Sequence, residues 1–292
     1  MAKSVKQTYL KRKGILIASS CISGLAVCFL ISALATDFWI TCGEDRGEEG
    51  YANVHYGLFK GRKDIKINIL AASSYDIFII CDEGMKECMY SCAATEESRL
   101  KVLQNAIAGI NTGENCDQGS ENRPLYASLL TKDAGFTGKE VNGTSDKVDL
   151  VSYELWLSTV IFLAFAIVMS LVTFGFTVYN ALGNPILTIV GPRGLYIWNG
   201  ASIFLCIFPL TLWGAQLIVY LSQDPMISES LDSDFDLSGC SRLDYSYWLI
   251  LGAAICHIVN VPLVKFRNIL RDPPPVVSEE EDQQVGGTIL LF

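Results

Sequence analysis

Histidine is nearly absent from this sequence, which contains 2 histidines in 292 residues. His55 and His257 lie far apart in the chain, and His257 falls in an apolar stretch, so we expect no Ser–His or Cys–His catalytic relay. The patterns HExxH and GxSxG, a phosphate-binding glycine loop and the basic patches typical of nucleic-acid binding are also missing. We therefore expect a protein that is not an enzyme, needs no cofactor and binds no nucleic acid.

Charged residues are sparse as well, at 18% of the chain against roughly 25% in typical soluble domains. Four apolar stretches contain no Asp, Glu, Lys or Arg, and each approaches the roughly 20 residues that cross a hydrocarbon core of about 30 Å. Uncharged spans favour contact with lipid and disfavour an ion or proton pathway. The sequence thus predicts a multi-pass protein in a lipid bilayer, with spans at residues 14–35, 155–178, 195–221 and 247–264.

The first span has an alternative interpretation as a secretory signal peptide. Lys11, Arg12 and Lys13 precede it, and its end at residues 33–35 resembles a cleavage site. An apolar run over residues 14–35 is, however, longer than the about 7 to 15 residues of a signal peptide. We expect an uncleaved first helix.

The distribution of Lys and Arg predicts the orientation in the membrane. If the spans alternate, these residues concentrate on one side, which is the cytoplasmic side by the positive-inside rule. Residues 1–13, the hairpin 179–194 and the tail 265–292 are then cytoplasmic, and the loops 36–154 and 222–246 are extracellular. The glycosylation acceptor Asn142-Gly143-Thr144 falls in the long extracellular loop, in agreement with this orientation. We expect a plasma-membrane protein that is glycosylated at Asn142.

The ten cysteines divide by the same topology. Cys21, Cys28, Cys206 and Cys256 lie within spans, where a free cysteine packs as a small apolar residue. The other six lie on the oxidising side, and their even number predicts disulfides, with 15 possible pairings. The four between positions 81 and 116 have an alternative role as thiolate ligands of zinc, which the oxidising compartment disfavours. The disulfide candidates are Cys42, Cys81, Cys88, Cys92, Cys116 and Cys240.

The long extracellular loop is predicted to begin as a β-sheet. Segments 37–41, 54–59, 65–70 and 75–80 are rich in β-branched and aromatic residues and are separated by Gly, Lys, Asp or Ser. After a predicted turn at 88–92, residues 96–110 place apolar side chains at helical spacing, which indicates a helix that covers the sheet rather than a groove for a partner. Residues 111–148 are polar and glycine-rich and predict an irregular loop.

Four polar side chains stand out inside the spans: Asn199 and Gln216 in the third, and His257 and Asn260 in the fourth. His257 and Asn260 are three residues apart, so they share a helix face from which both can bond to a neighbouring helix. A pH sensor or ligand at His257 is the alternative, but no acidic partner accompanies it in the spans.

The chain ends in the apolar residues Leu290-Leu291-Phe292, which follow a Gly-Gly pair. Such a terminus can add as a strand to a PDZ-type sheet edge while backbone amides bind its carboxylate. A short apolar end without a docking role is the alternative.

The connector between the second and third spans carries a distinctive set of residues: Tyr179-Asn180, Asn184-Pro185, Gly191-Pro192, Gly194, Tyr196 and Trp198-Asn199-Gly200. Together with YGLFKG at 56–61, SYWLIL at 246–251 and the ending ILLF, this connector resembles the clarin family of four-span membrane glycoproteins. The first loop is also similar to that of the claudins, which carry a Trp, then Gly-Leu-Trp, then two cysteines. Here that order is filled by Trp39, Gly57-Leu58-Phe59, Cys81 and either Cys88 or Cys92.

The resemblance implies a membrane α-helical fold, namely a left-handed, claudin-like bundle of four transmembrane helices with a small extracellular disulfide-linked β-sheet domain and a short extracellular helix. It also implies a plasma-membrane organiser that assembles membrane protein complexes in sensory or neuronal cells and links them to the actin cytoskeleton, with cytoplasmic adaptors as partners. Two alternatives remain open: claudin-like cell adhesion or barrier formation, and a role as auxiliary subunit of an ion channel.

Overall fold

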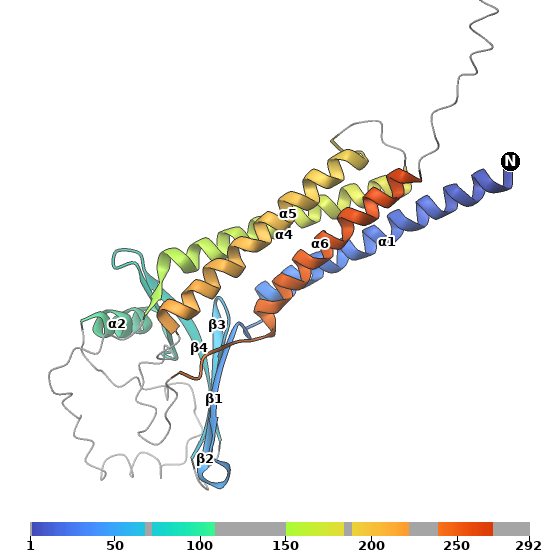
Figure 1. Ribbon diagram of the computed structural model, residues 1–292. Helices are drawn as coiled ribbons and strands as arrows, with labels where there is room; N and C mark the ends of the chain where they lie inside the picture. The colour runs from blue at the N-terminus through green and yellow to red at the C-terminus, as the bar shows by residue number, and fades with distance from the viewer. Residues whose placement is uncertain (1, 68–71, 109–149, 184–188, 222–238, 271–292) are drawn as a thin grey trace, which may run out of the picture.

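The computed structural model describes residues 2–67, 72–108, 150–183, 189–221 and 239–270 (Figure 1). Within these residues, four helices are long and apolar enough to cross a membrane. They form a bundle, which confirms the predicted four-span architecture. The helices are α1 (Ala2–Ala35), α4 (Tyr153–Leu182), α5 (Pro192–Gln216), which continues as the π-helical turn η2 (Leu217–Leu221), and α6 (Tyr245–Ile269).

The helices pack as a ring in which α1 contacts α4 and α6, and α5 contacts the same two helices. Two glycines lie at close contacts in this ring. A Cβ added at Gly24 of α1 would lie 3.3 Å from the ring of Phe174 in α4, and one at Gly252 of α6 would lie 3.2 Å from the ring of Phe29 in α1. Small residues of this kind let helix backbones approach closely, which matters because lipid supplies no hydrophobic drive between helices.

A seven-stranded antiparallel sheet in the order β6-β5-β4-β3-β2-β1-β7 lies at one end of the bundle, beside α2 (Glu96–Ile107), while the N-terminus of α1 lies at the opposite end (Figure 1). We call these the sheet end and the far end of the bundle. The strands are β1 (Ile40–Asp45), β2 (Gly50–Tyr56), β3 (Lys60–Ile67), β4 (Ser73–Asp82), β5 (Glu87–Ser91), β6 (Val151–Ser152) and β7 (Arg242–Leu243), with a 3-10 turn η1 (Gly47–Glu49) between β1 and β2.

The sheet confirms that each of the four predicted segments contributes to a strand but corrects their bounds: β1 begins at Ile40 rather than at residue 37, and β3 begins at Lys60 rather than at residue 65. Two turns are also corrected. Residues 57–59, predicted as strand, form the β2–β3 turn, in which the Gly57 N–H donates to the Lys60 carbonyl at 2.8 Å. Residues 88–92, predicted as a turn, lie mostly in β5. The β4–β5 turn comes earlier because Asp82 Oδ1 accepts from the N–H groups of Gly84 and Met85, and because Lys86 adopts a φ of 59°.

Helix α2 covers β4 and β5, as predicted. It begins with a capping box between Thr95 and Ser98 and buries Leu103 against Met89 and Leu150. It ends at Ile107, three residues before the predicted end, and the predicted irregular loop lies outside the described residues.

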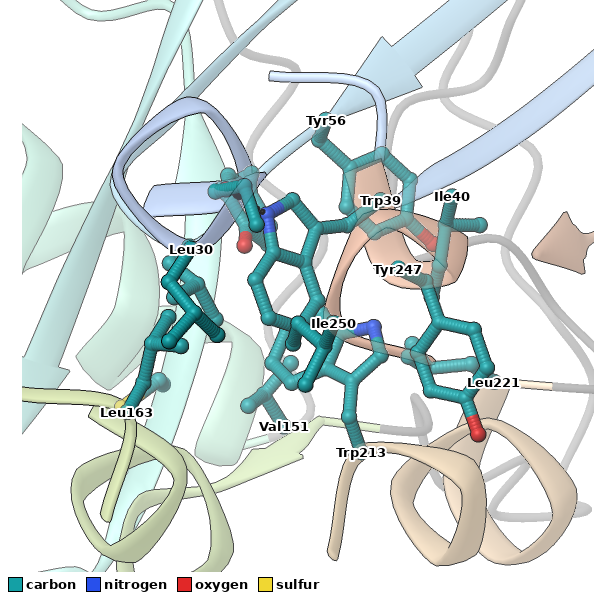
Figure 2. Close-up of a cluster of buried hydrophobic side chains, with 14 of the residues drawn as sticks. Leu30, Trp39, Ile40, Tyr56, Val151, Leu163, Trp213, Leu221, Tyr247 and Ile250 are labelled. Atoms are coloured by element: carbon teal, nitrogen blue, oxygen red, sulfur yellow. Dashed lines mark hydrogen bonds between the residues drawn. The ribbon is translucent and has the colours of Figure 1, made fainter. Parts of the chain in front are cut away.

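The sheet and the bundle share one hydrophobic core. Figure 2 shows side chains from helices and strands meeting at their junction, with Trp39 among Leu30, Trp213 and Ile250. The Trp39 and Trp213 rings meet edge to face with centroids 5.3 Å apart, and a buried aromatic pair of this kind contributes about 0.5 to 1.5 kcal/mol beyond its area. The sheet is therefore fixed to the helices rather than hinged on them.

Candidate functional site

Disulfides link the sheet at two places that the structure describes. Cys42 of β1 is bonded to Cys240, just before β7, with Cα atoms 5.1 Å apart. Cys81 of β4 is bonded to Cys88 of β5, which lies directly opposite in the register. Cys92 is disulfide-bonded as well. Cys116 and Asn142 lie outside the described residues, as do Leu290, Leu291 and Phe292.

The first link between sheet and bundle is Trp39, which precedes β1. Its indole N–H donates to the Ala33 carbonyl at the end of α1 at 2.7 Å. Its backbone N–H donates to the Tyr56 carbonyl of β2, and its own carbonyl accepts from the N–H of Asp244 before α6. One residue thus ties together two helices and the sheet.

The second link is the β2–β3 turn, whose three carbonyls are all used. The Tyr90 hydroxyl donates to the Gly57 carbonyl, the Trp156 indole of α4 donates to the Leu58 carbonyl at 2.7 Å, and the Ile79 N–H donates to the Phe59 carbonyl at 3.1 Å. A side chain at position 57 would place its Cβ only 2.6 Å from the Cα of Asp37, so glycine is required there. Trp39 and Gly57-Leu58-Phe59 of the claudin-like pattern therefore lie at this junction, whereas Cys81 and Cys88 join β4 to β5.

A ring stack lies beside Trp39. The ring of Phe38 stacks on that of His55 with centroids 4.1 Å apart and on that of Tyr245 at 5.1 Å. Burial lowers the pKa of His55 below its ordinary value, and the nearby carboxylates of Asp37 and Asp64 oppose that shift. His55 is therefore neutral when the sheet is folded at neutral pH.

Inside the bundle, Asn260 of α6 connects to α1 through two serines. The Ser19 hydroxyl donates to Asn260 Oδ1 at 2.9 Å, and Asn260 Nδ2 donates to the Ser23 hydroxyl at 2.6 Å. All three side chains are fully buried. The amide uses its donor and its acceptor on one neighbouring helix, so it fixes the register of α6 against α1.

His257 connects α6 to the other two helices. Its Nε2 lies 2.9 Å from the hydroxyl of Ser170 in α4, and its Nδ1 lies 3.1 Å from Oδ1 of Asn199 in α5. Since Asn199 Nδ2 donates to the Leu195 carbonyl at 2.8 Å, the oxygen of its amide faces the imidazole. Nδ1 then carries the proton and donates, and Nε2 accepts from Ser170.

The Ser170–His257–Asn199 chain has the connectivity of a serine hydrolase relay, which was not expected from the sequence. Ser170 is fully buried, however, in the middle of α4. The backbone N–H groups around it belong to a continuous helix, so they are not available as an oxyanion hole. The arrangement can hold three helices together, and it presents no nucleophile to a substrate.

We call the hydrogen-bonded side chains of Asn260, His257 and their partners the intramembrane polar network. It brings together three of the four polar residues predicted from the spans. Gln216 is separate: it lies at the sheet end, and both of its buried amide atoms have no hydrogen-bond partner among the described residues. The serines of the network were missed, because Ser and Thr in a span normally bond to their own helix and give no sequence signal.

Polar contacts continue from the network toward the far end, from buried to exposed positions. The Thr173 and Ser202 hydroxyls lie 3.2 Å apart between α4 and α5. Asn180 Nδ2 donates to the Val190 carbonyl at 2.5 Å, and the Trp198 indole donates to the Ile189 carbonyl at 3.1 Å. The connector that resembles clarins is thus held to both of its helices by side-chain bonds to its backbone.

These features define a class of protein: a four-span membrane protein whose helices are joined by neutral buried polar groups and which carries a disulfide-linked sheet at one end. Comparison with known proteins then finds a similarity to clarins. The Clarin-2 family model, described as Clarin-2-like, matches residues 135–264, a range that includes α4, α5 and most of α6.

Clarin-3 from Homo sapiens is 33% identical over 154 residues, which is 51% of this chain and 64% of that protein. Clarin-3 from Mus musculus is 26% identical over 149 residues, 51% of this chain and 64% of the relative. Clarin-1 from Homo sapiens is 22% identical over 120 residues, 41% and 52% of the two chains. These matches show that the chain is similar to clarins over about half of its length. The chain spans less than two thirds of the length of these relatives.

Proposed function

We propose that this protein is a non-enzymatic organiser that assembles membrane protein complexes at the plasma membrane of sensory or neuronal cells and links them to actin. The observation that carries the proposal is the intramembrane polar network. The polar groups of this network bond to one another across all four helices, so they hold the bundle together and leave no nucleophile free for catalysis. The lipid-facing helix surfaces, the sheet and the far end are then the surfaces that meet partners.

The proposed orientation has the sheet outside the cell and both termini in the cytoplasm. It is supported by the disulfides at the sheet end and by the Lys and Arg residues at the far end. The test is glycosylation of Asn142. In the wild type a glycosidase should shift the electrophoretic mobility, and Asn142→Gln should abolish the shift. An amino-terminal epitope that stains on unpermeabilised cells would contradict the orientation.

The proposed link to cytoplasmic adaptors runs through Leu290-Leu291-Phe292. Proximity labelling in native cells tests it with Phe292→Asp, which should lose PDZ-type adaptors if the terminus docks as a strand. The matched control is Val285→Asp, which makes a similar change before the Gly-Gly pair. Actin-associated neighbours in the wild type are expected, whereas a dominant channel subunit would favour the auxiliary-subunit alternative.

A second candidate is adhesion through the sheet. Its apolar side chains Phe59, Phe78 and Met85 are exposed, and the sheet is fixed rigidly to the bundle. A partner sheet on another cell can then pack against these side chains. Mixed cultures of expressing and non-expressing cells distinguish the two functions. Enrichment only at contacts between two expressing cells favours adhesion, and an even distribution favours the organiser.

A further inference from the structure

The far end of the bundle carries positive charge only, over the part that the structure describes. Cations from three helices lie there: Lys11 and Lys13 of α1, Arg193 of α5 and Lys265 of α6, all with exposed side chains. Residues 2–16, 176–183, 189–196 and 262–270, which form this end, include no Asp or Glu. No carboxylate side chain in these segments therefore offsets the positive electrostatic potential at this end.

These four cations lie within about 8 Å of one another along the bundle axis. The polar network relates the helices at two levels: Asn199 bonds to His257, and Ser19 bonds to Asn260, which lies about 4.5 Å beyond His257 toward the far end. At 1.5 Å per residue, Lys13 and Lys11 lie about 9 and 12 Å beyond Ser19. Arg193 lies about 9 Å beyond Asn199, and Lys265 lies about 8 Å beyond Asn260, all toward the far end. We call these four residues the basic layer.

The basic layer coincides with the edge of the hydrocarbon core. Residues 14–35 of α1 are uncharged and follow Lys13 directly, and a helix of this length spans about 33 Å, slightly more than a hydrocarbon core. Exposed apolar side chains adjoin the cations on the membrane side or beside them: Ile17 follows Lys13 by one turn, Ile197 follows Arg193 by one turn, and Phe266 follows Lys265. Lys13, Arg193 and Lys265 thus each have an exposed apolar side chain within about one helical turn that acyl chains can contact.

We propose that the basic layer binds anionic phospholipid headgroups, such as phosphatidylserine, in preference to zwitterionic ones. The phosphate and carboxylate of such a headgroup complement a layer of cations drawn from three helices, and its acyl chains complement the apolar side chains beside them. Each Lys or Arg near an anionic surface strengthens binding by up to roughly fivefold, and salt weakens the effect. The layer would hold an anionic lipid shell around the cytoplasmic end of the bundle.

The experiment uses the full chain reconstituted in phosphatidylcholine bilayers with trace amounts of spin-labelled phosphatidylserine or phosphatidylcholine. The motionally restricted component of each spectrum gives the relative association constant. The wild type should prefer phosphatidylserine severalfold. Lys11→Gln with Lys13→Gln should roughly halve the preference, and neutralising all four residues should bring it close to one.

The matched control is Lys60→Gln with Lys86→Gln, which removes two exposed cations from the sheet instead. Its preference should equal that of the wild type, and unfolding temperatures should show that all variants fold. A wild type without preference, or a fourfold variant that keeps it, overturns the proposal. A preference that appears only after residues Glu279 to Asp282 are changed to Gln and Asn also overturns the proposal, because the acidic tail would then occupy the basic layer in the wild type. The measurement needs no protein partner, so its outcome is separate from that of the organiser function.

Discussion

Replacement of Asn260 tests whether the polar network holds α6 against α1. Asn260 makes two hydrogen bonds to α1, one with Ser19 and one with Ser23. Asn260→Ala removes both bonds and leaves a cavity, because the side chain is fully buried. We expect the variant to fold with the same topology but with lower stability.

The magnitude follows from the number of bonds. Hydrogen bonds between side chains of membrane helices contribute about 0.6 kcal/mol on average and at most about 1.7 kcal/mol. Two bonds give a coupling of about 1 kcal/mol between Asn260 and the serine pair. The cavity adds about 1 kcal/mol, so Asn260→Ala should lower the free energy of unfolding by about 2 kcal/mol.

The assay is reversible unfolding in mixed micelles by increasing the fraction of denaturing detergent, followed by tryptophan fluorescence. A double-mutant cycle combines Asn260→Ala with Ser19→Ala and Ser23→Ala, and the coupling is the departure from additivity. Ser20→Ala is the matched control, since the Ser20 hydroxyl bonds only to the Leu16 carbonyl of its own helix. Additive effects, or a loss from Ser20→Ala as large as that from the serine pair, would refute the reasoning.

Three further predictions concern the sheet end. Gly57→Ala should destabilise the junction by about 1 to 3 kcal/mol, because the added Cβ meets the backbone of Asp37. Gly175→Ala is the control and should be neutral or stabilising, because nothing lies within 4 Å of its added Cβ; unfolding temperatures of the two variants test the difference. Burial lowers the pKa of His55 below its ordinary 6.5, so as the pH falls the unfolded chain binds the proton before the folded chain does. The contribution of His55 to the free energy of unfolding should therefore be complete above about pH 6.5 and decrease as the pH falls through the folded pKa. Unfolding temperatures measured over a pH series should show this slope in the wild type and lose it in His55→Asn. Loss of the Cys42–Cys240 bond, which closes a loop of 198 residues, should lower the free energy of unfolding by about 5 kcal/mol. Loss of the Cys81–Cys88 bond, which closes a loop of 7 residues, should lower it by about 2.5 kcal/mol. Equal losses of stability in the two paired Cys→Ser variants would contradict this prediction.

The four spans, the sheet and α2 were predictable because each rests on a local pattern. The length of the apolar stretches predicted the helices, and segments rich in β-branched and aromatic residues predicted the strands. The turn at residues 83–86 was not predicted, although Asp82 and Gly84 are residue types that favour turns. As a result, Cys88 was assigned to a turn, although its position in β5 is what pairs it with Cys81.

The candidate site was predictable only in part. Asn and His in an apolar span are conspicuous, so His257 and Asn260 were expected to bond to neighbouring helices. Their partners were not, because Ser170 lies 87 residues from His257, and Ser19 lies 241 residues from Asn260. The helical period predicts which residues share a face of one helix. Which face of another helix they contact depends on the packing of the whole bundle.

The position of α6 in the chain has a consequence for biosynthesis. It supplies Asn260 and His257, and Cys240 lies just before it, so the ribosome delivers these groups after the other three helices. Until then the nascent protein has a reduced thiol at Cys42 and helices without their lateral bonds. A chain truncated before Cys240 should therefore be retained by cellular quality control with Cys42 still open to alkylation, whereas truncation after α6 should leave that thiol protected.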